Sequence, residues 1–174
     1  MKIYYINLEN FIKTHDTDFL KKYTDGREFK SAKRFMEYTT GRYLVKTVAK
    51  EIYGLEDTEI IVEHDKPKFK NGGLHFSISH SGEYVAAAFA EQECGLDIEE
   101  IKPRDLTALS KRYEREFETQ KDFYEFWTEY EACIKLQSEE FCGKYTCVFQ
   151  DNYVLTAVST REITELSTIT SVIG

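Results

Sequence analysis

Apolar residues along the chain follow two spacings, one typical of strands and one typical of helices. Short runs rich in β-branched and aromatic residues predict five strands within the first hundred residues. These runs cover residues 2–8, 59–64, 74–80, 83–90 and 94–100. A turn at Ser81-Gly82 joins two of them into a hairpin, and a tight turn at Glu91-Gln92 leads into the last. Residues 65–73, with a proline and two glycines, indicate a turn region.

Helical spacing dominates two longer segments. From about Asp16 to Tyr53 the pattern predicts at least two helices, separated near Asp25-Gly26, and Gly54 is a helix-stop signal. The apolar stripe of the second helix consists of Leu44, Val45, Val48 and Ile52. Another helix is predicted over residues 120–137. Its apolar positions are Phe123, Phe126, Trp127, Tyr130 and Ile134.

The rest of the chain completes an α+β pattern. A charged helical segment follows Pro103, a hairpin is centred on Asp151-Asn152, and the tail over residues 161–173 suggests a final strand. The order of elements predicts an α+β fold built as a pseudo-dimer of two similar α+β halves. We expect these halves to be residues 1–92 and 93–174, with their junction near residues 90–95, although no sequence repeat relates them.

The balance of charge restricts the classes of partner. The chain has 174 residues, a formal net charge of −8 and a pI near 5.1, which argues against binding to nucleic acids or anionic membranes. Two basic islands stand out against this background. They are Lys21, Lys22, Arg27, Lys30, Lys33 and Arg34, and then Lys102, Arg104, Lys111, Arg112 and Arg115. Such islands suit a small polyanionic ligand or an acidic partner, or are solvated helix faces.

The cysteines and the N-terminus indicate the compartment. The four cysteines have no CxxC spacing and no nearby histidine, which argues against a zinc site. No apolar run has the length of a membrane span, and the N-terminal segment lacks the apolar core of a signal peptide. A cytoplasmic, monomeric protein with reduced thiols is expected.

Acidic residues interrupt the apolar run at residues 94–100. Asp97 and Glu99 should project to one face of a strand, where two carboxylates are costly unless a cation lies between them. Glu131 and Lys135 lie one turn apart on the same face of the predicted helix 120–137. An acid at this position could join Asp97 and Glu99 in a three-carboxylate Mg²⁺ site. The alternative is a wet strand face together with an ordinary Glu131–Lys135 surface pair.

Three further segments carry candidate ligand contacts. Adjacent Ser79 and His80 face opposite ways on a strand, so they suit phosphate contacts or turn capping better than a nucleophile–base pair. Lys66-Pro67 lies in a basic segment that could cover a nucleotide, although charged loops are common. Gly41 precedes Arg42 inside a predicted helix, where glycine costs about 1 kcal/mol relative to alanine, so a ligand or another backbone could approach closely.

The order of these segments is more specific than any one of them. Lys66-Pro67, then FSISHS, GLDIE and FWTEYEACIK, resembles the 4′-phosphopantetheinyl transferase superfamily in its longer, single-chain, Sfp-like type. The resemblance covers about residues 41–136. It implies a pseudo-dimeric α+β fold with coenzyme A bound in the cleft between the halves.

The resemblance also assigns roles to residues. Asp97, Glu99 and Glu131 match the family's Mg²⁺ ligands, and Lys135 matches a lysine that contacts the coenzyme A pyrophosphate. The implied reaction is attack by a serine of an apo acyl or peptidyl carrier protein on the β-phosphate of coenzyme A, releasing 3′,5′-ADP. Glu131 is the first candidate for the base, and Asp97, Glu131 and Lys135 are the expected catalytic residues.

Other matches concern the nucleotide. His80 matches a histidine near the 3′-phosphate, with Ser79 beside it, and Lys66-Pro67 matches a loop beside the adenine. Arg42 lies where the family places a basic group near the phosphates.

The chain departs from the family pattern at Tyr130, where a lysine usually precedes the helix glutamate. The change removes a positive charge near the phosphates. The alternative to an active transferase is therefore a non-catalytic coenzyme A-binding or carrier-binding module that has lost efficient transfer.

Overall fold

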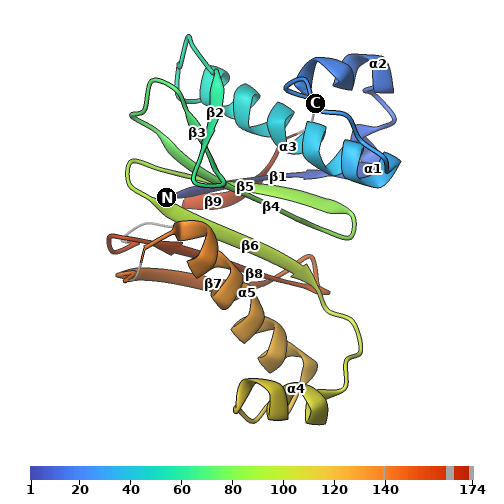
Figure 1. The fold of residues 1–174 in the computed structure, drawn as a ribbon, viewed down its shortest axis with the longest axis vertical. Coiled ribbons are helices and arrows are strands. Elements are labelled where there is room, and N and C mark those ends of the chain that lie inside the picture. Colours follow the sequence, from blue (N-terminus) through green and yellow to red (C-terminus); the bar gives the residue numbers. More distant parts are fainter. Residues whose placement is uncertain (139, 164–166, 173–174) are drawn as a thin grey trace.

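The computed structural model describes residues 1–138, 140–163 and 167–172, and has the α+β architecture expected from the sequence (Figure 1). The strands form a four-stranded sheet of order β4-β5-β1-β9, a three-stranded sheet of order β6-β8-β7, and a separate β2-β3 hairpin. The strand bounds are β1 Lys2–Asn7, β2 Ile60–Glu63, β3 Lys66–Phe69, β4 His75–Ser81, β5 Tyr84–Ala90, β6 Cys94–Glu100, β7 Gly143–Phe149, β8 Tyr153–Ser159 and β9 Ser167–Ser171.

The long helix α3 (Ala32–Glu51) covers one face of the four-stranded sheet. Ser31 begins the helix, because its hydroxyl accepts the Arg34 N–H. The predicted stripe is buried at Leu44, Val45 and Val48, but Ile52 is 55% exposed because the helix ends one residue before it. The predicted helical segment before α3 contains only two short helices, α2 (Thr17–Leu20) and the 3₁₀ helix η1 (Lys21–Tyr23). A further short helix, α1 (Leu8–Phe11), precedes that segment and was not predicted.

The helix α5 (Gln120–Leu136) covers the three-stranded sheet, and α4 (Leu106–Tyr113) packs near its start. The sequence prediction for α5 is confirmed to within one residue. A capping box explains where it begins, since the Thr119 hydroxyl accepts the Asp122 N–H and the Asp122 carboxylate accepts the Thr119 N–H. Among the described residues, none of the helices combines the length and apolarity needed to cross a bilayer.

The two larger sheets share one order of elements. In the first, a strand (β1), a long helix (α3) and a hairpin (β4-β5) follow each other, and β1 pairs antiparallel with β5. In the second, β6, α5 and β7-β8 do the same, and β6 pairs antiparallel with β8. The tail strand β9 instead pairs parallel with β1, so the C-terminal residues join the first sheet.

One expected turn region proved to contain a strand. Residues 66–69 form β3, which pairs antiparallel with β2 and places Pro67 opposite Val62. Proline is tolerated here because a two-stranded hairpin consists only of edge strands. The hairpin stands over the end of the first sheet, beside α3 (Figure 1).

The two sheets meet where their edge strands β4 and β6 run side by side. Three serines at alternate positions of β4 accept backbone N–H groups of β6, always nineteen residues further along the chain, which makes the two strands parallel. We call this row of contacts the serine seam. Its bonds join Ser77 to Leu96 at 2.9 Å, Ser79 to Ile98 at 3.3 Å and Ser81 to Glu100 at 3.0 Å.

Replacing Ser77 with alanine should destabilise the protein. The variant leaves the Leu96 N–H without its acceptor in a buried seam, which costs about 1–3 kcal/mol. Chemical denaturation of the variant and the wild type measures the change in unfolding free energy. Ser171→Ala, at an exposed position of β9, is the matched control and should change stability by less than about 0.5 kcal/mol. Equal stability of the two variants would contradict a stabilising role for the seam.

Candidate functional site

The face of β6 that carries Gly95, Asp97 and Glu99 lies beneath α5. A Cβ atom added at Gly95 would lie 1.9 Å from the Ala132 carbonyl oxygen, so the helix backbone rests directly on the strand. Only glycine allows this approach. The same contact fixes the height of α5 above β6 and brings Lys135 over Asp97.

Asp97 is not on a wet face, since it is only 4% exposed. Its Oδ1 accepts hydrogen bonds from the Ser79 hydroxyl and the Lys135 ammonium, both at 2.7 Å. Lys135 also donates to the Ser79 Oγ at 2.9 Å. The cation that the acidic strand required is thus, in this conformation, the ammonium of Lys135. The surface pair considered for Glu131 and Lys135 is not seen among the described contacts.

Glu99 completes the acidic face. The Ser81 hydroxyl donates to its carboxylate at 2.8 Å, as Ser79 does to Asp97 one step along the seam. Burial raises the pKa of Glu99 and the negative charge of Asp97 adds to that effect, while Ser81, Trp127 and Lys135 act in the opposite direction. This carboxyl group therefore gains from any additional cation beside it.

The fit of a Mg²⁺ ion can be judged from these carboxylates. The second Asp97 oxygen, Oδ2, is buried and has no hydrogen-bond partner in the described part of the chain, as expected of an oxygen that receives a cation. Glu131 is half-buried and shows no hydrogen bond or ion pair there. Still, the described residues contain no group of three acidic, histidine or cysteine side chains placed to hold a metal together. The oxygen chemistry fits, but the three-carboxylate arrangement is not assembled in this conformation.

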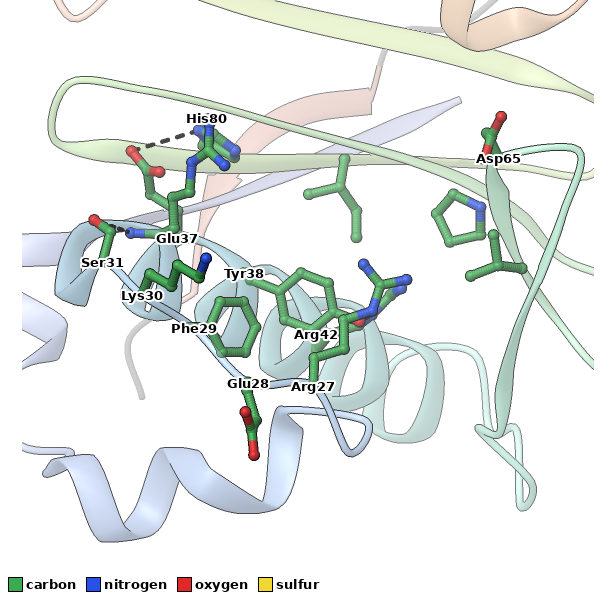
Figure 2. Close-up of a pocket in the computed structure, with 14 residues that line it drawn as sticks. Arg27, Glu28, Phe29, Lys30, Ser31, Glu37, Tyr38, Arg42, Asp65 and His80 are labelled. Carbon is green, nitrogen blue, oxygen red and sulfur yellow. Dashed lines mark hydrogen bonds and ion pairs between the residues drawn. The ribbon is translucent and has the colours of Figure 1, made fainter.

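A basic pocket of about 970 Å³ lies between α3, the segment before it and the β2-β3 hairpin (Figure 2). The sequence-predicted residues Arg42, Pro67 and His80 line it. Three members of the first basic island, Arg27, Lys30 and Arg34, line it as well, beside the aromatic rings of Phe29 and Tyr38. The sequence marked that island as a polyanion site or a solvated face, and only the fold shows that part of it borders a cavity.

Ser79 and His80 do face opposite ways, as strand geometry predicted. Ser79 is buried, and its hydroxyl donates to Asp97. The half-exposed His80 points into the basic pocket (Figure 2). The His80 Nδ1 lies 3.6 Å from a carboxylate oxygen of Glu37, which is itself 7% exposed. Partial burial lowers the pKa of His80, although the Glu37 charge opposes this.

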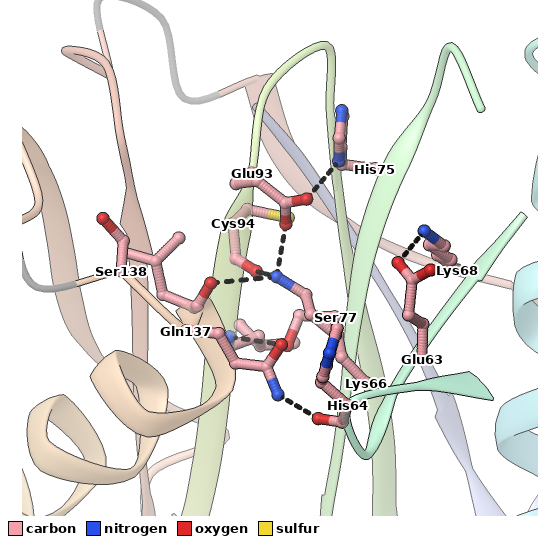
Figure 3. A network of polar contacts seen from close by, with 12 residues as sticks. Glu63, His64, Lys66, Lys68, His75, Ser77, Glu93, Cys94, Gln137 and Ser138 are labelled. Atoms are coloured by element: carbon pink, nitrogen blue, oxygen red, sulfur yellow. Dashed lines mark hydrogen bonds and ion pairs between the residues drawn. The ribbon is translucent and has the colours of Figure 1, made fainter.

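The side chains of Lys66 and Pro67 have different surroundings although the two residues are adjacent in the sequence. The Lys66 ammonium points toward the second half of the chain, where it donates to the Glu93 carboxylate, to the Leu136 carbonyl at 3.1 Å and to the Cys94 carbonyl at 3.4 Å (Figure 3). Pro67 lines both the basic pocket and a second pocket of about 310 Å³, which Lys66 and Lys135 also border. Lys66 therefore joins the hairpin to the end of α5 and the start of β6.

Tyr130 occupies an exposed position on α5, at 48%. Its ring lies nearly parallel to those of Trp127, at 5.7 Å between centroids, and Phe126, at 6.3 Å. The residue that departs from the family pattern is thus part of an aromatic stack one residue before Glu131.

Comparisons with known proteins concern the chain as a whole. No protein-family model matches the chain. It is 29% identical to the 4′-phosphopantetheinyl transferase ffp of Bacillus subtilis over 160 residues, which cover 80% of this chain and 71% of that protein. It is 28% identical to the 4′-phosphopantetheinyl transferase Sfp of Bacillus subtilis strain 168 over 159 residues, with coverage of 80% and 71%. The transferase psf-1 of Bacillus pumilus is 35% identical over a shorter stretch of 111 residues, 55% of this chain and 47% of that protein.

An α+β fold with a lysine-bound buried aspartate beside a basic pocket defines a candidate enzyme site for a phosphorylated substrate. With these relatives, the chain is similar over most of its length to 4′-phosphopantetheinyl transferases of the Sfp-like type. The family resemblance of the sequence motifs is thereby confirmed.

Replacing Gly95 with alanine should disrupt the site as well as the fold. The new methyl group collides with backbone rather than with a flexible side chain, so α5 must move away from β6. We expect a loss of about 3 kcal/mol or more in unfolding free energy, measured by chemical denaturation. Gly41→Ala is the matched control, because its methyl group would meet only side chains, Ile78 at 3.1 Å and Val85 at 3.7 Å, and alanine favours the helix. An equal loss of unfolding free energy in both variants would mean that the close contact between Gly95 and the α5 backbone does not contribute to stability.

Proposed function

We propose that this protein transfers the 4′-phosphopantetheine arm of coenzyme A to a serine of an apo acyl or peptidyl carrier protein, with Mg²⁺, and releases 3′,5′-ADP. The observation that carries the proposal is the buried Asp97, which has one oxygen bound to Lys135 and the other without a partner in the described part of the chain. The curated relatives named as 4′-phosphopantetheinyl transferases support it.

The expected position of coenzyme A was the cleft between the halves, but the basic pocket is lined by residues 27–80 alone, whereas residues of both halves border the second pocket. The shared order of strand, long helix and hairpin, with the first strand antiparallel to the last, is what a pseudo-dimer requires. We assign residues 1–92 and 93–174 to its two halves, except that β9 adds to the first sheet. The basic pocket would take the phosphorylated nucleoside, with His80 and Arg42 at its phosphates and Pro67 at its base.

The acidic face would take the pyrophosphate end. Asp97, Glu99 and Glu131 would hold Mg²⁺, which when bound supplies positive charge for the pyrophosphate oxygens. Lys135 lies at the boundary of the second pocket, where its ammonium can neutralise charge on the leaving phosphate. In this function the main role of Ser79 is to hold Asp97 and Lys135 together, and the phosphate contact expected from the sequence is a minor role.

The chemical step needs one proton acceptor. The carrier serine oxygen forms a bond to the β-phosphorus, and the bond from that phosphorus to the bridging oxygen breaks, so 3′,5′-ADP leaves with the electron pair. The serine proton goes to a carboxylate, directly or through water. Glu131 is our candidate, since its half-buried carboxylate has no hydrogen bond among the described residues.

A second candidate function follows from Tyr130. Tyr130 stacks on Trp127 and carries no positive charge, whereas the family pattern has a lysine at this position before Glu131. A site whose chemistry is weakened in this way could still bind coenzyme A or a carrier protein. This alternative predicts binding without transfer. The monomeric state and the cytoplasmic location stay predictions.

The function is tested by incubating the protein with coenzyme A, Mg²⁺ and a panel of apo carrier proteins, and measuring carrier mass. Transfer adds the phosphopantetheine arm, and Asp97→Ala should lower the rate at least about 100-fold while circular dichroism stays native. Asp18→Ala, which removes only an exposed Asp18–Lys21 pair, is the control with unchanged rate.

The outcomes of this assay separate the alternatives. Unmodified carriers across the panel would rule out the transferase and leave the binding module. Cleavage of coenzyme A without any carrier would instead indicate a phosphohydrolase. An Asp97→Ala protein that does not fold would mean that the aspartate is structural.

The position of His80 can be tested by its titration. Without ligand the NMR midpoint of His80 should lie below the ordinary pKa of 6.5, because partial burial favours the neutral ring. Saturation with 3′,5′-ADP should raise the midpoint, since a phosphate beside the ring favours the imidazolium. Adenosine, which has no phosphate, is the control ligand and should not move it. An unchanged midpoint with bound 3′,5′-ADP would place the phosphates elsewhere.

A further inference from the structure

The most deeply buried charge in the basic pocket is the guanidinium of Arg42, in the middle of α3. Arg42 is 4% exposed, and a charged group so removed from water needs a partner. The partner is Asp25, whose Oδ2 lies 2.8 Å from the Arg42 Nε. Asp25 comes from the loop before α3, seventeen positions earlier in the sequence, so the pair depends on how that loop folds back on the helix.

Three side chains of α3 hold the Asp25 carboxylate. The Tyr38 hydroxyl donates to Oδ2 at 3.0 Å, in addition to Arg42, and the Lys46 ammonium lies 3.3 Å from Oδ1. The backbone of Asp25 has a φ of +50°, followed by Gly26 at +75°. Aspartate and asparagine tolerate this left-handed conformation better than most residues. The loop therefore makes a tight turn that aims one carboxylate at the helix.

Asp25 does not line the pocket, but two of the three side chains that contact it do. Arg42 and Tyr38 line the pocket, as does Arg27, and Asp25 does not. The guanidinium carbons of Arg27 and Arg42 lie 5.0 and 4.9 Å from the centroid of the Tyr38 ring (Figure 2). Two positive charges on one ring repel each other unless anions balance them, and Asp25 balances one of them.

The Asp25 contact also leaves Arg42 free to bind. The Arg42 Nε–H donates to the Tyr38 hydroxyl at 3.2 Å, and the Nε atom lies 2.8 Å from Asp25 Oδ2 in the ion pair, while a guanidinium has five N–H donors in a fixed plane. The four N–H groups on the terminal nitrogens have no acceptor among the described residues. Once Nε is anchored, the plane of the guanidinium is fixed, and the remaining donors keep one orientation for a phosphate.

We propose that Asp25 is a positioning residue that holds Arg42, through its Nε and through Tyr38, in the orientation that binds a phosphate of the nucleotide. The inference rests on the proposed function, because it needs a phosphorylated ligand in the basic pocket. It predicts a change in ligand affinity opposite in direction to the change that charge alone predicts. By charge alone, removing a carboxylate near a phosphate site tightens binding, whereas loss of a positioning residue weakens it.

The test is Asp25→Asn, which keeps the shape of the side chain and suits the left-handed turn. Isothermal titration calorimetry with 3′,5′-ADP should show about tenfold weaker binding than for the wild type, since an arginine that is no longer preorganised must be ordered by the ligand. Glu28→Gln removes a carboxylate that does line the pocket and should tighten binding. The pair of variants separates positioning from simple charge.

A double-mutant cycle separates positioning from a general loosening of the loop. In an Arg42→Gln background, Asp25→Asn should have no further effect on affinity, because the group that it positions is gone. An additional tenfold loss there would overturn the inference. If Asp25→Asn does not fold, Tyr38→Phe tests the same link, since it removes the hydroxyl between Asp25 and Arg42 and keeps the ring. It should also weaken binding, and unchanged affinity would count against the inference.

The outcomes distinguish this inference from the function on which it rests. If the wild type binds 3′,5′-ADP and Asp25→Asn binds it equally well or more tightly, Asp25 does not position Arg42 and the proposed function stands. If the wild type does not bind 3′,5′-ADP, the nucleotide site is wrong and the inference fails with it.

Discussion

The serine seam between β4 and β6 is the constraint on which the site depends. Each strand is the edge of its own sheet, and the N–H groups of such an edge need acceptors. Serine hydroxyls supply them, and because a hydroxyl also donates, Ser79 and Ser81 each hold a carboxylate of β6 as well. The same contacts that join the two sheets therefore orient Asp97 and Glu99. A backbone ladder would join the strands but could not hold the acids.

Charge balance explains the rest of the acidic face. Gly95 lets α5 rest on β6, which brings the Lys135 ammonium to Asp97 and neutralises it without a ligand. The second Asp97 oxygen keeps its desolvation cost. A bound cation would relieve that cost, and Lys135 could then turn to a phosphate.

The sequence predicted what depends on local periodicity and little of what depends on tertiary packing. Alternation along β6 correctly placed both acids on one face, opposite the buried Ile98, because successive side chains of a strand point to opposite sides. It could not place Lys66, whose ammonium crosses to the other half of the chain, since side-chain direction there depends on how the hairpin meets α5. The Asp25–Arg42 pair was invisible for the same reason. Residue types suggested a three-carboxylate site, but the described residues do not assemble one.

Tyr130 shows how one substitution can change a site without removing it. A lysine there would extend a charge toward the phosphates, whereas the tyrosine ring packs on Trp127, and that indole helps to keep Glu99 ionised. Arg27, Lys30, Arg34 and Arg42 already surround the basic pocket. A polyanionic ligand would therefore meet several positive charges even without a lysine in place of Tyr130, so the substitution bears on the chemical step more than on binding.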